Sequence, residues 1–163
     1  MVDTAVYTMV KDIVTIVGII SGVSYYIMSV RNQQRAQEAQ VLLQLNQTFL
    51  NKDMIKDWAQ FLNMNFEDLQ DLYEKTSPST NMDGYLQRSR VWRLITTLGL
   101  IIRKGLVSAE TVYDTLSGKY IIQMWDRDGP LIEEMRIQDN APHHLKGFEY
   151  CADEMRNVEK RRT

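Results

Sequence analysis

An uncharged run of 18 residues near the N-terminus, Ile13 to Val30, constrains this chain more than any other feature. As a helix rising about 1.5 Å per residue, the run extends about 27 Å, close to the roughly 30 Å hydrocarbon core of a bilayer. Charged residues bound it on both sides, with Lys11 and Asp12 before it and Arg31 after it. The run therefore predicts a single membrane-spanning helix.

Residues at the second end of the run predict contact with lipid headgroups, where aromatic and basic side chains are favoured. The expected contacts come from four side chains: Tyr25, Tyr26, Arg31 and Arg35. Lysine and arginine are slightly more frequent just after the run than before it. The positive-inside rule then places the N-terminus outside the cell and the C-terminal domain in the cytoplasm.

Gly18 and Gly22 lie four residues apart within the run. Two glycines at this spacing make a flat groove on a helix, which lets a second backbone approach closely. They predict a helix–helix contact, either with a protein partner or with a second copy of the chain.

Three other interpretations of residues 13–30 are weaker. A buried core helix is shorter and does not continue into a long polar stretch. A cleaved signal peptide has a positively charged start, whereas Asp3 and Asp12 here accompany a single lysine. An interfacial helix has a strongly charged face, which this run lacks.

The rest of the sequence predicts an all-α fold. Residues 31–50 contain no glycine or proline and are rich in good helix formers, so we expect the membrane helix to continue into a stalk. Beyond it, apolar residues recur at helical spacing, with cap signals at Asn51, Gly105 and Ser108. Gly118 is expected to end the helix that begins after Ser108. We expect a short extracytoplasmic segment, a membrane helix, a stalk and a compact cytoplasmic bundle of about five to six helices, over residues 1–12, 13–30, 31–50 and 51–163.

Composition excludes some classes of function. The net charge is −2 and the pI is about 5.7, whereas nucleic-acid-binding domains have a pI above roughly 9. Nucleic-acid binding is therefore disfavoured. Cys151 is the single cysteine, so no intrachain disulfide forms.

Candidate metal sites fail on spacing. Neighbouring residues His143 and His144 point about 100° apart on a helix, and with Cys151 they are too few for a four-ligand zinc site. Residues 126–129 resemble part of a calcium loop, but methionines, Met124 and Met135, occupy positions that need oxygen ligands. We interpret 126–129 as a turn that caps a helix starting at Pro130, and we predict no metal and no cofactor.

No catalytic constellation emerges either. The acidic cluster of Asp126, Asp128, Glu133 and Glu134 is interpreted as a solvated surface, and Cys151 as a small buried side chain. Trp92 lies among three arginines at positions 88, 90 and 93, but it belongs to an apolar stripe and is assigned to the core. The arginines are interpreted as a solvated face or as contacts to anionic lipid.

Several blocks in the second part of the chain resemble a known family. They are Val91–Arg93, Ile101–Val107, Thr111–Tyr113, Ile121–Trp125, Pro130–Ile132 with Arg136, and Gly147–Tyr150. Over about residues 42–155 the chain resembles an uncharacterised prokaryotic family of small single-pass membrane proteins, known only as a domain of unknown function. The resemblance implies a membrane helix followed by a helical cytoplasmic domain, and it implies no catalytic residues.

These observations predict a single-pass membrane protein that acts as a non-enzymatic interaction module or as an accessory subunit of a membrane complex. Its expected partners are the lipid bilayer and, through the membrane helix, another protein or a second copy. The alternative is a membrane-tethered enzyme or sensor with a site that no motif reveals. A closed core with an exposed apolar patch favours the first hypothesis, and a polar pocket with buried ionisable groups favours the second.

Overall fold

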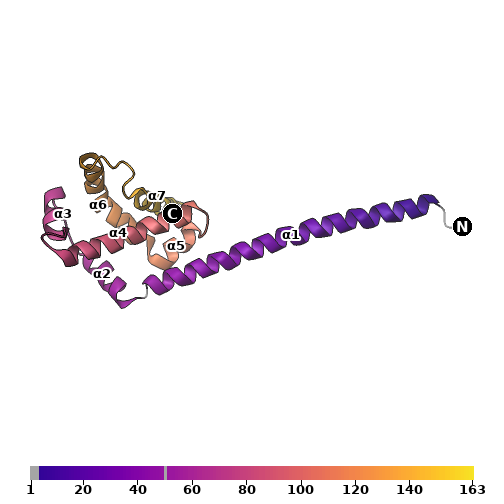
Figure 1. The fold of residues 1–163 in the computed structure, drawn as a ribbon, viewed down its shortest axis with the longest axis horizontal. Coiled ribbons are helices and arrows are strands. Elements are labelled where there is room, and N and C mark those ends of the chain that lie inside the picture. The colour runs from indigo at the N-terminus through magenta and orange to yellow at the C-terminus, as the bar shows by residue number, and fades with distance from the viewer. Residues whose placement is uncertain (1–3, 50) are drawn as a thin grey trace. The chain divides into compact units, whose positions relative to one another are not determined.

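The computed structural model describes the backbone of residues 4–49 and 51–163, and the side chains of residue 11 and of residues 15–49 and 51–163. All regular structure in this part of the chain is helical (Figure 1), which confirms the predicted all-α class. It consists of α1 (Thr4–Phe49), α2 (Lys52–Leu62), α3 (Leu69–Thr76), α4 (Met82–Arg103), α5 (Ala109–Leu116), α6 (Gly118–Gln138) and α7 (Lys146–Arg162). The chain divides into two units, Met1–Gln40 and Val41–Thr163.

The structure contradicts the predicted membrane-spanning helix. Among the residues that it describes, no helix is both long and apolar enough to cross a membrane. The side chain of Ile13, at the start of the predicted span, lies outside the described residues. The described remainder, Thr15 to Val30, extends only about 24 Å, and glycine, serine and tyrosine dilute its isoleucine and valine. The membrane location and the orientation deduced from this span are corrected with it.

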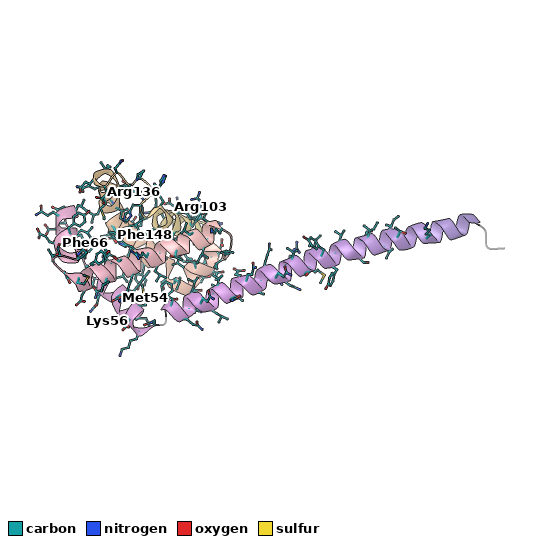
Figure 2. The ribbon with its side chains drawn as sticks, viewed as in Figure 1. Met54, Lys56, Phe66, Arg103, Arg136 and Phe148 are labelled. Atoms are coloured by element: carbon teal, nitrogen blue, oxygen red, sulfur yellow. The ribbon has the colours of Figure 1, made fainter. Side chains whose placement is uncertain are left out.

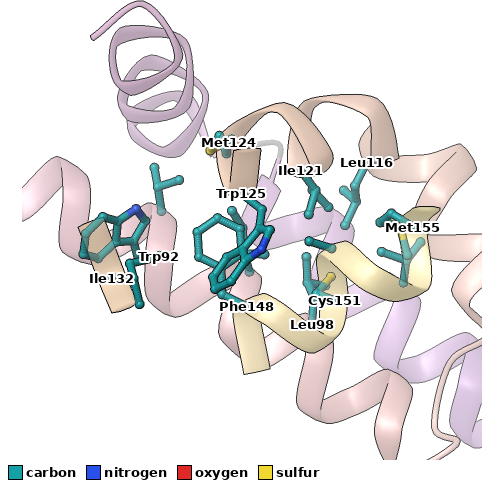
Figure 3. Close-up of a cluster of buried hydrophobic side chains, with 14 of the residues drawn as sticks. Trp92, Leu98, Leu116, Ile121, Met124, Trp125, Ile132, Phe148, Cys151 and Met155 are labelled. Atoms are coloured by element: carbon teal, nitrogen blue, oxygen red, sulfur yellow. The ribbon is translucent and has the colours of Figure 1, made fainter. Parts of the chain in front are cut away.

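Within the unit formed by residues 41–163, α4 packs against α2, α3 and α7, and α7 also packs against α5 and α6. The core lies between these helices (Figure 3). Its centre contains an edge-to-face pair of rings, Trp125 from α6 and Phe148 from α7, with centroids 5.1 Å apart. Figure 2 shows Phe148 in the interior, whereas the side chain of Lys56 on α2 extends into solvent.

Local capping residues set most helix boundaries. Asn51, Asp68, Asn81 and Ser108 each accept a hydrogen bond from a backbone N–H in the first turn of the helix that follows. Gly105, just after α4, has a φ of 67°, a left-handed conformation that glycine adopts without steric cost. The caps predicted at Asn51, Gly105 and Ser108 are confirmed.

Two predicted boundaries are wrong. Gly118 does not end a helix but begins α6, because the ring of Tyr113 packs where a β-carbon at residue 118 would lie. The left-handed residue between α5 and α6 is instead Ser117, with a φ of 54°. The predicted turn before Pro130 is also absent, since α6 continues through it and buries Leu131 on its far side.

The backbones of α4 and α7 approach each other closely at two glycines. A β-carbon at Gly99 would overlap the carbonyl oxygen of Gly147, and one at Gly147 would overlap the carbonyl oxygen of Thr96. Both glycines are buried. They therefore allow α7 to lie against α4 at a separation that no larger residue permits.

We expect Gly99→Ala to lower the free energy of unfolding by about 1–3 kcal/mol, because a backbone carbonyl must move to admit the methyl group. Urea unfolding followed by circular dichroism measures the change. Gly18→Ala is the control, since a β-carbon there meets no described atom within 4 Å. Equal stability of the two variants would show that α4 and α7 do not pack this closely.

Candidate functional site

The residues singled out in the N-terminal segment lie on the surface of α1. Tyr25 and Tyr26 are 76% and 68% exposed. Gly18 and Gly22 face open space, since a β-carbon at either position would meet no described atom within 4 Å. Nothing in the structure tests the helix–helix contact predicted at these glycines. The predicted headgroup contacts presupposed the membrane span that is corrected above.

An apolar stripe follows one side of α1. At about 100° per residue, its six side chains fall within an arc of about 100°; they are Ile16, Ile19, Ile20, Val23, Ile27 and Val30. Five of the six are between 47% and 62% exposed, and Val30 is half-buried. Within the unit of residues 1–40, no described side chain covers this stripe. The stripe is therefore an exposed apolar surface of that unit.

The histidines and the cysteine do not form a metal site in the described part of the chain, which contains no group of three or more potential metal ligands. His143 and His144 are exposed in the segment between α6 and α7. Cys151 is fully buried in the core, as predicted. Burial, with a smaller contribution from Glu154, raises the pKa of the Cys151 thiol to about 12.

We expect iodoacetamide to leave Cys151 unmodified in the folded protein at pH 8, because the thiolate is the nucleophile and the buried thiol stays protonated. Alkylation measured by mass spectrometry should appear only when urea unfolds the chain. The raised pKa also makes stability depend on pH. Below pH ~8.5 the Cys151 thiol is protonated in both the folded and the unfolded chain, and above that pH stability falls because only the unfolded chain loses the proton. Rapid modification of the folded protein would contradict this burial.

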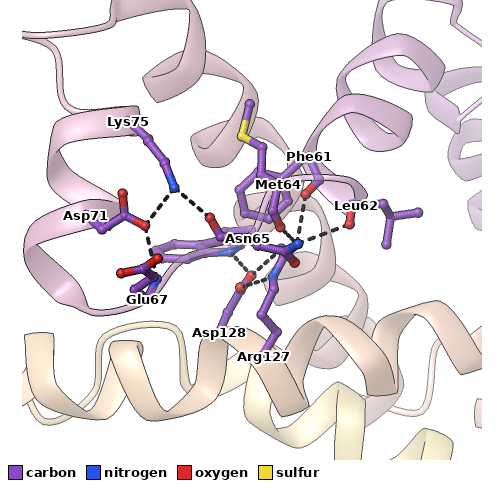
Figure 4. Close-up of polar contacts among 10 residues, drawn as sticks. Phe61, Leu62, Met64, Asn65, Glu67, Asp71, Lys75, Arg127 and Asp128 are labelled. Atoms are coloured by element: carbon purple, nitrogen blue, oxygen red, sulfur yellow. Dashed lines mark hydrogen bonds and ion pairs between the residues drawn. The ribbon is translucent and has the colours of Figure 1, made fainter.

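The carboxylate of Asp128 on α6 accepts three hydrogen bonds from side chains in the interior (Figure 4). Asp128 is fully buried. One oxygen accepts a hydrogen bond of 2.9 Å from the indole Nε1 of Trp92 on α4. The neighbouring guanidinium of Arg127 donates to both oxygens, at 2.6 and 3.1 Å. Trp92 is thus a core residue, as predicted, whereas Asp128 is not part of a solvated acidic cluster.

Arg127 also joins α6 to the end of α2. Its Nη1 donates to the carbonyl oxygens of Phe61 at 3.0 Å and Leu62 at 3.2 Å, and to that of Met64. Its guanidinium lies 4.8 Å from the ring centroid of Phe61 and 5.3 Å from that of Phe66. One side chain therefore satisfies the free carbonyls at the end of α2 and neutralises Asp128.

We expect Arg127→Met to destabilise the fold by about 3–5 kcal/mol, because it leaves the buried carboxylate of Asp128 without its cation. Thermal and urea unfolding provide the measurement. Arg156→Met is the matched control, since Arg156 pairs with the exposed carboxylates of Asp126 and Asp153, and its loss should cost less than about 1 kcal/mol. Equal losses would refute a special role for Arg127.

Arg88 on α4 is a second buried arginine, predicted above as part of a solvated face. It is only 6% exposed. The described part of the chain provides no ion pair and no hydrogen bond to its guanidinium, and Nη1 is completely buried. It lies instead against aromatic rings, 5.0 Å from the Trp92 centroid and 5.8 Å from that of Tyr85. Burial lowers the pKa of Arg88.

Arg136, near the end of α6 (Figure 2), is buried to a similar degree, at 8% exposed. Its Nε donates to the carbonyl oxygen of His144 at 2.7 Å, and its Nη1 pairs with Glu149 at 2.8 Å. Its Nη2 is buried without a hydrogen-bond partner among the described residues. Sequence patterns carry no signal for this arrangement, because the partners of Arg136 are 8 and 13 residues away and include a backbone carbonyl.

The other two arginines of the predicted face lie elsewhere. Arg90 pairs with the nearly buried carboxylate of Asp57 at 2.7 Å. Arg90 and Arg93 line a groove of about 890 Å³ together with amide and hydroxyl side chains of residues 44–51. Trp92 faces the core, so the structure does not bring these arginines and Trp92 to one surface. Glu133 and Glu134 are exposed, as predicted.

These features define the protein as a helical domain with a closed apolar core, two buried arginines and an additional N-terminal helix. The family model for the domain of unknown function DUF4760 matches residues 9–155. The chain therefore belongs to this family, and the predicted membership in a family of unknown function is confirmed. No curated protein and no solved structure matches the chain.

Proposed function

We propose that the chain is a non-enzymatic interaction module, in which the apolar stripe of α1 pairs with the same stripe of a second copy. The single observation that carries this proposal is the exposure of the stripe, with Ile16, Ile19 and Ile20 each more than half exposed. A contiguous apolar surface of this kind marks a site of interaction.

The spacing of the stripe favours pairing of two helices. Ile16, Val23 and Val30 are seven residues apart, the spacing of one position in each heptad of a coiled coil. All three are β-branched, which suits that position in a parallel pair. Ile19 occupies the second core position of the first heptad, and the two remaining isoleucines flank the seam.

The charges near the stripe favour a second copy as the partner. With Ile16, Val23 and Val30 at the core position, Arg31, Arg35 and Glu38 fall on the outer positions of the heptad. Over residues 15–38, a parallel pair of identical chains therefore brings no like charges into contact at the seam. Identical helices also align the β-branched layers in register, and a symmetric pair is the commonest form of association.

We expect the full-length chain to form dimers in sedimentation experiments at about 1–100 µM. Val23→Lys should weaken the dimer at least tenfold, about 1.4 kcal/mol, because it places a charge in the seam. Ser21→Lys, on the opposite side of the helix, is the matched control and should leave the dimer intact.

Oxidative cross-linking tests the geometry. Val23→Cys should give a disulfide-linked dimer and Ser21→Cys should not, while Cys151 is buried and contributes no background. A monomer at every concentration, capture of a different protein by the stripe, or partition of the monomeric chain into lipid vesicles would contradict the proposal.

A further inference from the structure

One end of the unit formed by residues 41–163 contains a buried positive charge without a partner. α3, the first turns of α4 and the last turns of α6 lie at this end (Figure 1). The Nη1 group of Arg88 and the Nη2 group of Arg136 are both buried there without a hydrogen-bond acceptor in the described part of the chain. Buried guanidinium groups are normally paired, because removing a charge from water is unfavourable.

The ion pairs around the buried arginines show which positive charge is unbalanced. Asp128 neutralises Arg127, and Glu149 neutralises Arg136. Arg88 forms no ion pair and no hydrogen bond with the described residues, and it lies against the faces of two aromatic rings. Asp128 is near enough to act on its charge, but that carboxylate already pairs with Arg127 and accepts from Nε1 of Trp92. The three arginines and two carboxylates therefore carry one net positive charge.

We propose that this cluster binds a small oxyanion with about one negative charge, whose oxygens accept hydrogen bonds from the free N–H groups of Arg88 and Arg136. Guanidinium groups present paired donors that fit the oxygens of phosphate and carboxylate groups. The proposal is independent of the self-association of α1, since it involves none of the residues of the apolar stripe.

Two half-exposed or exposed side chains define where the oxyanion would enter. Burial raises the pKa of Tyr73 on α3, Asp139 and Glu134 add to the rise, and Arg88 opposes it, so Tyr73 lies within reach of the Arg88 charge. Burial, Arg136 and Arg88 lower the pKa of His144, in that order, and Asp139 opposes them. His144 thus lies within the field of both arginines.

The approach from the His144 side is favoured over the approach from α3, although one carboxylate, Asp139, acts on both Tyr73 and His144. On the α3 side, a groove of about 640 Å³ contains the carboxylates of Asp68, Glu74 and Glu134, which repel an anion. On the other side, the segment between α6 and α7 has two residues in the left-handed region, Asn140 with a φ of 49° and Leu145 with a φ of 54°. Strained residues of this kind cluster at ligand-binding and switch segments.

The first experiment compares thermal unfolding in phosphate, acetate and chloride at equal ionic strength. We expect phosphate or acetate to raise the melting temperature of the full-length protein by several degrees over chloride, with saturation. Arg88→Met should abolish this rise, and its melting temperature in chloride should be higher than that of the unsubstituted protein, because it removes an unpaired buried charge. Arg93→Met, at an exposed arginine of the same helix, should retain the response to oxyanions.

A purely structural role for Arg88 predicts the opposite result. If Arg88 only packs against its two rings, Arg88→Met lowers the melting temperature and oxyanions have no effect in the unsubstituted protein. This outcome would overturn the proposal. A larger rise of the melting temperature in phosphate than in acetate would indicate a phosphate site, and the reverse would indicate a carboxylate site.

A second experiment needs no variant. Proton NMR follows the titration of His143 and His144 in the unsubstituted protein with and without phosphate. An oxyanion between the two arginines should raise the pKa of His144, since it offsets their positive field, and leave that of the exposed neighbour His143 in place. Equal shifts of both histidines, or none, would overturn the proposal even if the Arg88→Met variant failed to fold.

Discussion

The carboxylate of Asp128 is the acceptor on which three helices of the compact unit depend. It belongs to α6, accepts from Trp92 of α4, and orients Arg127 toward the last carbonyls of α2. The donors to this carboxylate, the indole of Trp92 and the guanidinium of Arg127, are buried or half-buried. Loss of the carboxylate would therefore leave both without this acceptor. The network therefore fixes α4 on α6 and α2 on both, while the surrounding apolar contacts supply most of the burial.

Local signals in the sequence predicted much of this fold. Asn51, Gly105 and Ser108 act on the backbone within one turn, so their chemistry is readable from neighbouring residues. Gly118 and Pro130 were misinterpreted because their roles depend on tertiary contacts. A ring from the preceding helix packs against Gly118, and burial of the following residues keeps the helix continuous through Pro130. The uncharged run of residues 13–30 was misinterpreted for another reason, because its length, its lack of charge and its flanking residues suggested a membrane span although the described part of the run is not apolar enough to form one.

The candidate sites were less predictable than the helices. Arg88 lies among other arginines in a short polar stretch, which is typical of a solvated face, and no local pattern reveals that the side chain turns inward. The apolar stripe was not recognised in the sequence, because residues 13–30 were interpreted as a membrane helix, on which every face would be apolar. The two proposals concern different units of the chain and can be tested separately. Self-association involves residues 1–40, and oxyanion binding involves residues 41–163.

The close approach of Gly99 and Gly147 has a consequence for the order in which the protein folds. α7 supplies some of the most deeply buried side chains, among them Phe148, Cys151 and Met155, and it follows α4 to α6 in the chain. During synthesis, the face of α4 that receives α7 has no partner until α7 has left the ribosome. We therefore expect the apolar face of α4 to be the part of the nascent chain most exposed to chaperones and to misassociation.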